Sequence, residues 1–134
     1  MKNVIMMVDD NIEVRNLFVD LLVDTSLKVF TFASVKDAQV YLINPKNRSQ
    51  VCAIVSDLMM GPTDGLEFLS YIKKNPDTAA IDFFLLTGAD VSVFKPFISP
   101  FTLKGIIEKP FNRQAFLNTF NSIARDNVDK KIAA

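Results

Sequence analysis

The sequence predicts an α/β domain built on a parallel sheet with helices on both faces. Five short apolar runs alternate with segments whose apolar residues recur at helical spacing. The runs are apolar almost throughout rather than at every second position, which is typical of strands buried on both faces of a doubly wound sheet. The expected strands are residues 4–8, 28–32, 51–56, 81–87 and 105–109.

The first helix is expected over residues 12–23, directly after the first strand. Its apolar residues form one stripe, and Asn11 or Asp10 is a suitable N-terminal cap. One alternative is that this turn only caps the helix, in which case the neighbouring Asp9 has no function of its own. No basic residue nearer than Arg15 follows these two carboxylates along the chain.

Further helices are expected between the later strands. Residues 35–43 follow Ser34, which with Asp37 resembles a capping box, and Asn44-Pro45 ends the pattern. Residues 66–72 carry another apolar stripe. A terminal amphipathic helix is expected from residue 112 onward.

The segment between the fourth and fifth strands, residues 89–101, contains Pro96 and Pro100. Each proline costs about 3 kcal/mol inside a helix, more than side-chain pairs on the helix surface return. We therefore expect a short helical turn followed by an irregular segment. Its Phe and Ile side chains either cover the sheet or form an exposed apolar patch.

Length and composition fit one domain in a reducing compartment. A chain of 134 residues, 49% of them hydrophobic, can bury roughly two-thirds of its unfolded surface in one core. The formal net charge is zero, so no global field attracts nucleic acid or an anionic membrane. Cys52 is the single cysteine and lies in an apolar run, which favours a buried thiol. Because the run at residues 4–8 suits neither a signal peptide nor a spanning helix, we expect a cytoplasmic protein.

Polar side chains follow four of the predicted strands where each strand ends. In a doubly wound sheet, ligands bind outside the carboxyl ends of the strands, so these residues are expected to converge on one site. The chain has no His and one Cys, which leaves a hard cation held by oxygen as its possible metal. Neighbouring carboxylates repel one another unless a cation lies among them, and Mg²⁺ is the natural candidate. The residues are Asp9, Asp10, Asp57, Thr87 and Lys109.

The residue types at these strand ends indicate phosphoryl transfer. The charge of Lys109 and the hydroxyl of Thr87 suit a tetrahedral phosphoryl group, and a carboxylate can be the nucleophile that accepts it. Asp57 is the expected nucleophile because it stands alone at its strand end. The adjacent Asp9 and Asp10 are placed to hold the metal.

Four motifs carry a family resemblance: "DD" at 9–10, "DLMMGPTDG" at 57–65, "TG" at 87–88 and "KPF" at 109–111. In this order they resemble the response-regulator receiver domain of two-component signalling, close to the chemotaxis regulators, with a core over about residues 3–125. The resemblance implies a flavodoxin-like five-stranded sheet in the order 2-1-3-4-5. Residues 1–134 would then be a single receiver domain with a short charged C-terminal tail.

The resemblance also implies how the site works. Asp57 would take a phosphoryl group from the phosphohistidine of a sensor histidine kinase or phosphotransfer protein. Asp10, Asp57 and the carbonyl of Met59 would bind Mg²⁺, with Asp9 orienting the waters of the ion. Such a domain is a signalling phosphoacceptor rather than an enzyme, with self-catalysed transfer and slow autodephosphorylation only.

The expected output is a change in protein contacts. By the resemblance, Thr87 and Lys109 would contact the phosphoryl group, and an output protein would bind over residues 89–111. The chain, a monomer or weak dimer, would be either a stand-alone receiver or part of a larger regulator or hybrid kinase.

Two departures from the family pattern stand out. Gly61-Pro62 stand in reverse order compared with the family, which alters the loop after Asp57. Three positions before Lys109, where the family has an aromatic residue, this chain has Ile106. An isoleucine cannot make the inward and outward movement of an aromatic side chain that the family uses as a switch. We expect Ile106 to be an ordinary core residue.

Two other functions use similar residues. A phosphatase of the haloacid-dehalogenase type also uses Asp, Thr, Lys and Mg²⁺, but its nucleophile lies in a D-x-D motif after the first strand. A degenerate receiver would only bind partners, and the full set of site residues argues against that reading.

Overall fold

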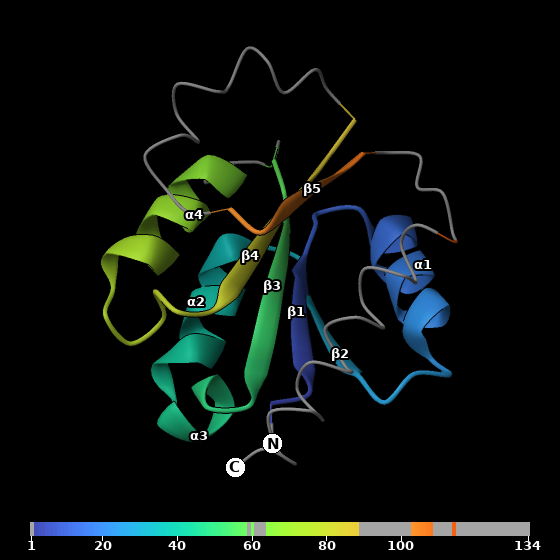
Figure 1. Ribbon diagram of the computed structural model, residues 1–134. Helices are drawn as coiled ribbons and strands as arrows, with labels where there is room; N and C mark the ends of the chain where they lie inside the picture. The colour runs from blue at the N-terminus through green and yellow to red at the C-terminus, as the bar shows by residue number, and fades with distance from the viewer. Residues whose placement is uncertain (1, 59, 61–63, 89–102, 109–113, 115–134) are drawn as a thin grey trace.

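Five parallel strands form one sheet, as predicted (Figure 1). The computed structural model describes residues 2–58, 60, 64–88, 103–108 and 114. The strand order is β2-β1-β3-β4-β5, which confirms the flavodoxin-like order 2-1-3-4-5. The strands are β1 (Val4–Val8), β2 (Lys28–Phe32), β3 (Val51–Asp57), β4 (Asp82–Thr87) and β5 (Gly105–Glu108).

The helices lie on both faces of this sheet. In Figure 1, α1 lies on one side of the sheet, and α2 and α4 lie on the other. This arrangement confirms the doubly wound architecture and follows from the burial of the strands on both faces. The helices are α1 (Ile12–Leu22), α2 (Val35–Ile43), α3 (Pro45–Arg48) and α4 (Gly65–Lys74).

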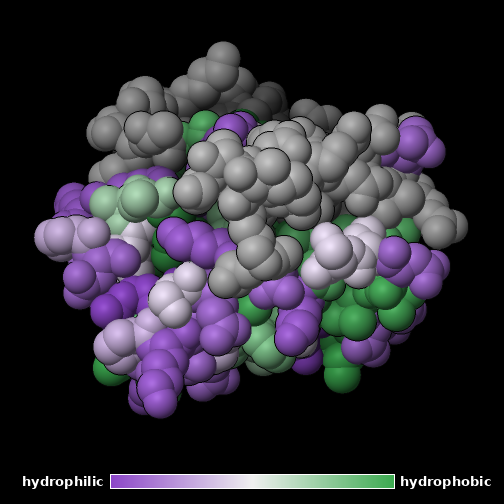
Figure 2. Space-filling model, turned by 60° about the horizontal axis from the view of Figure 1, so that its bottom comes forward, coloured by the Kyte–Doolittle hydropathy of each residue, from purple (hydrophilic) through white to green (hydrophobic). Residues whose placement is uncertain are grey.

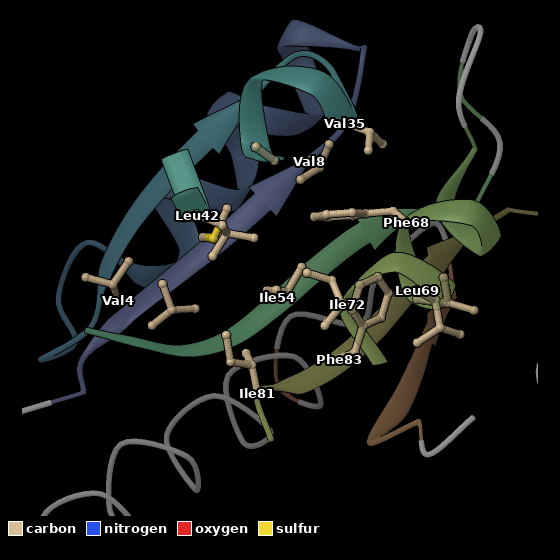
Figure 3. Close-up of a cluster of buried hydrophobic side chains, with 14 of the residues drawn as sticks. Val4, Val8, Val35, Leu42, Ile54, Phe68, Leu69, Ile72, Ile81 and Phe83 are labelled. Carbon is tan, nitrogen blue, oxygen red and sulfur yellow. The ribbon is translucent and has the colours of Figure 1, made fainter. Parts of the chain in front are cut away.

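Alternate residues of each central strand supply two separate hydrophobic cores. From β1, Val4, Met6 and Val8 belong to the core under α2 and α4. Figure 3 shows Val4 and Val8 in this core. The rings of Phe68 on α4 and Phe83 on β4 meet there edge to face, with centroids 5.6 Å apart. This core also contains Val35, Ala38, Leu42, Ile54, Leu69, Ile72 and Leu85.

The opposite core lies under α1. Ile5 and Met7 of β1 pack there with Phe18 and Leu22, the two buried residues of the α1 stripe. All five residues of β1 are fully buried. Because this strand has apolar neighbours on both faces of the sheet, the run "VIMMV" does not alternate between apolar and polar residues. Cys52 belongs to this core, which confirms the expected buried thiol.

The short helix α3 was not predicted. Asn44-Pro45 was expected only to end the preceding helix, but Pro45 is also the first residue of α3. Proline suits that position because its missing N–H has no partner in the first turn anyway. The side chain of Asn44 caps the new helix by accepting from the N–H of Lys46 at 2.9 Å.

Two side chains fix the connection between α4 and β4: Lys73, near the end of α4, and Thr78, in the connection itself. Lys73 Nζ donates to the carbonyl oxygens of Ala79 and Ile81, at 3.0 and 2.6 Å. Burial lowers the pKa of Lys73, and the nearby charge of Asp82 opposes that change. Thr78 Oγ1 donates to the carbonyl of Ile72 at 2.7 Å. These bonds fix where β4, the strand that ends in Thr87, enters the sheet.

Ile106 is not the buried core residue that the sequence suggested. Its side chain is 40% exposed. It lies on β5, the edge strand next to β4, so the sheet has no further strand beside it to help cover this side chain. The expected irregular segment at 89–101 and the terminal helix from residue 112 lie outside the described residues.

The surface combines polar side chains with a few exposed apolar ones. In Figure 2, among the residues drawn in colour, hydrophobic side chains gather toward the side on which α1 lies, and hydrophilic ones predominate elsewhere. On and just after α1, Ile12, Val19 and Val23 are exposed. Across the described ranges, every helix is too short or too polar to cross a bilayer.

Candidate functional site

Three carboxylates meet at the carboxyl end of the sheet. Asp9, Asp10 and Asp57 each offer one oxygen, and these oxygens lie within 4.8 Å of one another. The register explains the meeting: Val8 of β1 pairs with Ser56 of β3, so the residue after each of them stands at the same edge. Asp9 and Asp57 are buried, and Asp10 is exposed. The structure thus brings these three residues of the predicted site together.

Three hydrogen bonds hold Asp9, the residue that follows β1. Its N–H donates to the carbonyl of Phe32 at 3.1 Å. Its carboxylate Oδ1 accepts from the N–H of Asn11 at 2.9 Å, and its carbonyl accepts from Arg15 Nη1 at 2.7 Å. These bonds determine the direction in which the two adjacent carboxylates leave the strand.

Asn11, rather than either aspartate, caps α1. Its side-chain oxygen accepts from the N–H groups of Glu13 and Val14, at 2.8 and 3.4 Å. The capping alternative is therefore correct for Asn11. The N-cap of α1 is therefore neither Asp9 nor Asp10.

Asp57 ends β3, and α4 packs directly against its backbone. The N–H of Gly65 donates to the carbonyl of Leu58 at 3.0 Å, and the N–H of Leu58 donates to Leu86 at 2.9 Å. A Cβ placed on Gly65 would lie only 2.2 Å from the carbonyl oxygen of Asp57. Asp64 caps α4 by accepting from the N–H of Glu67 at 2.9 Å. In the pair Asp64-Gly65, the aspartate therefore caps α4, and the glycine begins it at a position that has no room for a larger side chain.

Thr87 ends β4 beside this group. Asp57 pairs with Leu86 in the β3–β4 ladder, so Thr87 stands one position beyond that pair, and it is buried. Thr87 in turn pairs with Glu108, the last residue of β5. The other two predicted site residues, Lys109 and Met59, lie outside the described residues.

The acidic group has the donor chemistry that a Mg²⁺ site requires. Mg²⁺ is bound through one or two carboxylates together with waters and phosphate oxygens. Two buried carboxylates and one exposed carboxylate supply such oxygens. The residues present therefore fit this ion.

The sequence did not indicate the contacts that Arg15 and Gly65 make beside the acidic group. The position of Arg15 in the first turn of α1 was visible, but its hydrogen bond to the Asp9 carbonyl depends on the turn between β1 and α1. Gly65 was noted in the sequence only as part of the motif at residues 57–65. The reason for a glycine there, the close approach of its helix to Asp57, is a tertiary contact that the sequence does not show.

Comparison with known proteins agrees with the fold and the motifs. Residues 5–121 match the family model of the response regulator receiver domain. None of the curated proteins compared with the chain matches it. Among solved structures, a chemotaxis protein of Vibrio cholerae has a TM-score of 0.79 at 23% identity, covering 92% of this chain and 99% of its own.

Two more solved structures are similar to the chain. A response regulator receiver protein from Pseudomonas putida has a TM-score of 0.80 at 20% identity, covering 91% of this chain and 98% of its own. A phosphorylated phytochrome response regulator from a cyanobacterium has a TM-score of 0.76 at 23% identity, covering 92% and 91%. At these identities the structures establish the fold, and the family model establishes the family. The chain belongs to the response regulator receiver domain family of two-component signal transduction.

Proposed function

We propose that this chain is the phosphoacceptor of a phosphorelay and that Asp57 carries the phosphoryl group. The observation that carries the proposal is the meeting of Asp9, Asp10 and Asp57 within 4.8 Å at the carboxyl edge of a receiver sheet. Receiver domains generally bind Mg²⁺ at such an acidic cluster, and they act as signalling domains rather than as enzymes. We propose that residues 1–134 form one such domain.

The proposed reaction is an in-line displacement at phosphorus. A carboxylate oxygen of Asp57 forms a bond to phosphorus, and the P–N bond of a partner's phosphohistidine breaks, with its electron pair left on the imidazole. Asp57 suits this role because it is buried at 7% exposure, which shields the acyl phosphate from water. The incoming phosphoryl group approaches from the side where Asp10 is exposed.

The other site residues would bind the metal ion and the phosphoryl group. Asp9, Asp10, Asp57 and the carbonyl of Met59 would hold Mg²⁺, which when bound offsets the negative charge on the phosphoryl oxygens. The hydroxyl of Thr87 would donate to a phosphoryl oxygen, and Lys109 would pair with another. For Thr87, the support is its place at the end of β4, one position beyond the pair of Asp57 with Leu86.

The proposed partners follow from this reaction. A sensor histidine kinase or a phosphotransfer protein supplies the phosphoryl group in the cytoplasm, and an output protein binds over residues 89–111. The formal net charge of zero supports protein partners rather than nucleic acid. Family membership favours this signalling role over a haloacid-dehalogenase type phosphatase.

The test is phosphorylation by a small donor. After incubation with acetyl phosphate and Mg²⁺, the intact mass of the protein should increase by one phosphoryl group, and EDTA should prevent the increase. The same preparation should not turn over p-nitrophenyl phosphate. Sustained turnover of that ester, or an unchanged mass with Mg²⁺ present, would contradict the proposed function.

Neutralising Asp10 should separate folding from metal binding. Without metal, Asp10→Asn should raise the free energy of unfolding by roughly 0.5–1 kcal/mol, the scale of a solvent-screened repulsion between carboxylates. With saturating Mg²⁺ the order should reverse, because wild type gains the stabilisation that tight binding provides. Urea unfolding with and without Mg²⁺ measures both effects, and Asp24→Asn, an exposed carboxylate after α1, is the control. Equal responses of Asp10→Asn and Asp24→Asn to Mg²⁺ would remove Asp10 from the metal site.

A further inference from the structure

We propose that Arg15 is a positioning residue for the acidic group, acting on the peptide bond that joins Asp9 to Asp10. This inference rests on the proposed function. Arg15 Nη1 donates to the Asp9 carbonyl at 2.7 Å, across six positions of sequence. That carbonyl belongs to the peptide unit between the two adjacent carboxylates, so a bond to it fixes the plane from which both side chains project.

The geometry of the turn gives this bond its effect. The Asp9 N–H and the Asp9 carboxylate already have partners in Phe32 and Asn11. The guanidinium bond holds the carbonyl end of the residue. Without it, the peptide between Asp9 and Asp10 can rotate, and the exposed Asp10 carboxylate can turn away from Asp57 to reduce repulsion.

Charge and positioning predict opposite results for metal binding. A positive guanidinium beside the site repels Mg²⁺, so by charge alone its removal should tighten binding. As a positioning residue, Arg15 holds three repelling carboxylates in the arrangement that binds the ion, so its removal should weaken binding. Residues that orient metal ligands typically change affinity about 10–100-fold when they are replaced.

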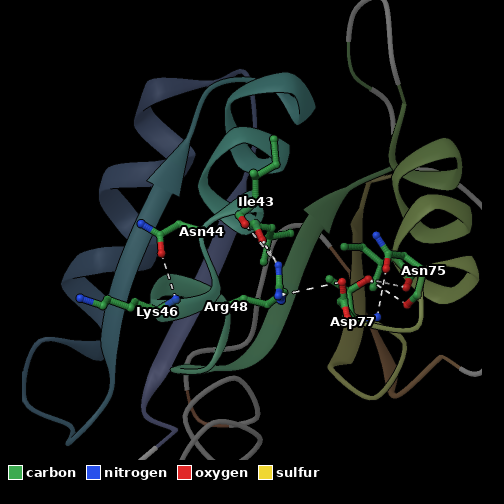
Figure 4. A network of polar contacts seen from close by, with 9 residues as sticks. Ile43, Asn44, Lys46, Arg48, Asn75 and Asp77 are labelled. Atoms are coloured by element: carbon green, nitrogen blue, oxygen red, sulfur yellow. Dashed lines mark hydrogen bonds and ion pairs between the residues drawn. The ribbon is translucent and has the colours of Figure 1, made fainter.

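The chain contains a matched control for this bond. Arg48 is the fourth residue of α3, as Arg15 is the fourth of α1, and it also follows an Asn cap by four positions. Its Nη1 donates to the carbonyl of Leu42 at 3.0 Å, again six positions earlier. Figure 4 shows Arg48 between α2 and the loop that contains Asp77, with which it forms an ion pair at 3.9 Å. This loop precedes β4, so Arg48 lies at the amino end of the strands, away from the acidic group.

The experiment compares wild type with Arg15→Gln, Arg15→Lys and Arg48→Gln. Isothermal titration calorimetry gives the Kd for Mg²⁺ alone, and urea unfolding without metal reports whether each variant folds. Arg15→Gln should raise the Kd about tenfold. Arg15→Lys, which keeps the charge and one donor, should lie between Arg15→Gln and wild type. Arg48→Gln should leave the Kd within about twofold of wild type, as expected for a bond outside the metal site.

The outcomes separate this inference from the proposed function. If wild type binds Mg²⁺ and Arg15→Gln binds it equally well or more tightly, the positioning role is wrong and the proposed function stands. If Arg15→Gln does not fold, Arg15→Lys decides, and a Kd equal to that of wild type overturns the role. Wild type that binds no Mg²⁺ overturns both.

Discussion

Replacing Gly65 with alanine is expected to lower the free energy of unfolding by about 3 kcal/mol, at the upper end of the usual cost of overpacking. The added Cβ would lie 2.2 Å from the Asp57 carbonyl oxygen and 3.0 Å from Leu58 Cα. Both are backbone atoms, which cannot move aside as the end of a side chain can. The gain in helix propensity from glycine to alanine returns only about 1 kcal/mol.

Urea unfolding of Gly65→Ala measures this cost, and Gly105→Ala is the matched control. At Gly105, among the residues that the structure describes, the added Cβ would meet the ring of Phe84, at 3.5 and 3.6 Å, which is ordinary contact. Its unfolding free energy should therefore change by less than about 1 kcal/mol. Similar stabilities of the two variants would show that α4 can move away from Asp57, contrary to the close packing described above.

The second large effect is expected for Asp57→Asn. The amide is close in shape to the carboxylate, so the fold should be retained, but it lacks the nucleophilic oxygen charge. Uptake of a phosphoryl group from acetyl phosphate and Mg²⁺ should be lost completely. Mg²⁺ should also bind more weakly, because one of the three carboxylates of the group is gone.

Asp77→Asn is the control for this variant. Asp77 lies in the loop before β4, where it pairs with Arg48, at the amino end of the strands. Its replacement removes the same charge far from the site and should leave phosphorylation unchanged. Intact mass after a fixed incubation compares both variants with wild type. Undiminished labelling of Asp57→Asn would assign the phosphoryl group to another residue.

The sheet was predictable because its strands are buried on both faces. Such strands leave continuous apolar runs in the sequence, and β1 shows the pattern in full, with Met6 facing one core and Met7 the other. The convergence of Asp9 and Asp57 followed from the same pattern, since parallel strands end at a common edge. The strand order came from the family resemblance, because periodicity alone carries no information on neighbours.

What the sequence did not indicate depends on tertiary contacts. Pro45 ends one helix and begins another, and only the path of the chain distinguishes these two roles. Ile106 is the kind of residue that is usually buried, but it lies on an edge strand and is exposed. The roles of Arg15 and Gly65 depend on where a carbonyl oxygen lies, at Asp9 for the first and at Asp57 for the second.

The location of the phosphoryl group in the wild-type protein decides whether Asp57 is the acceptor. Borohydride reduces an aspartyl phosphate to an alcohol, so reduction after treatment with acetyl phosphate and Mg²⁺ marks the acceptor permanently for peptide mass spectrometry. We expect reduction at Asp57 alone, in the peptide that continues from β3, and none in the presence of EDTA. Reduction at Asp9 or Asp10 instead, or a phosphoryl group on a serine or threonine, would contradict it.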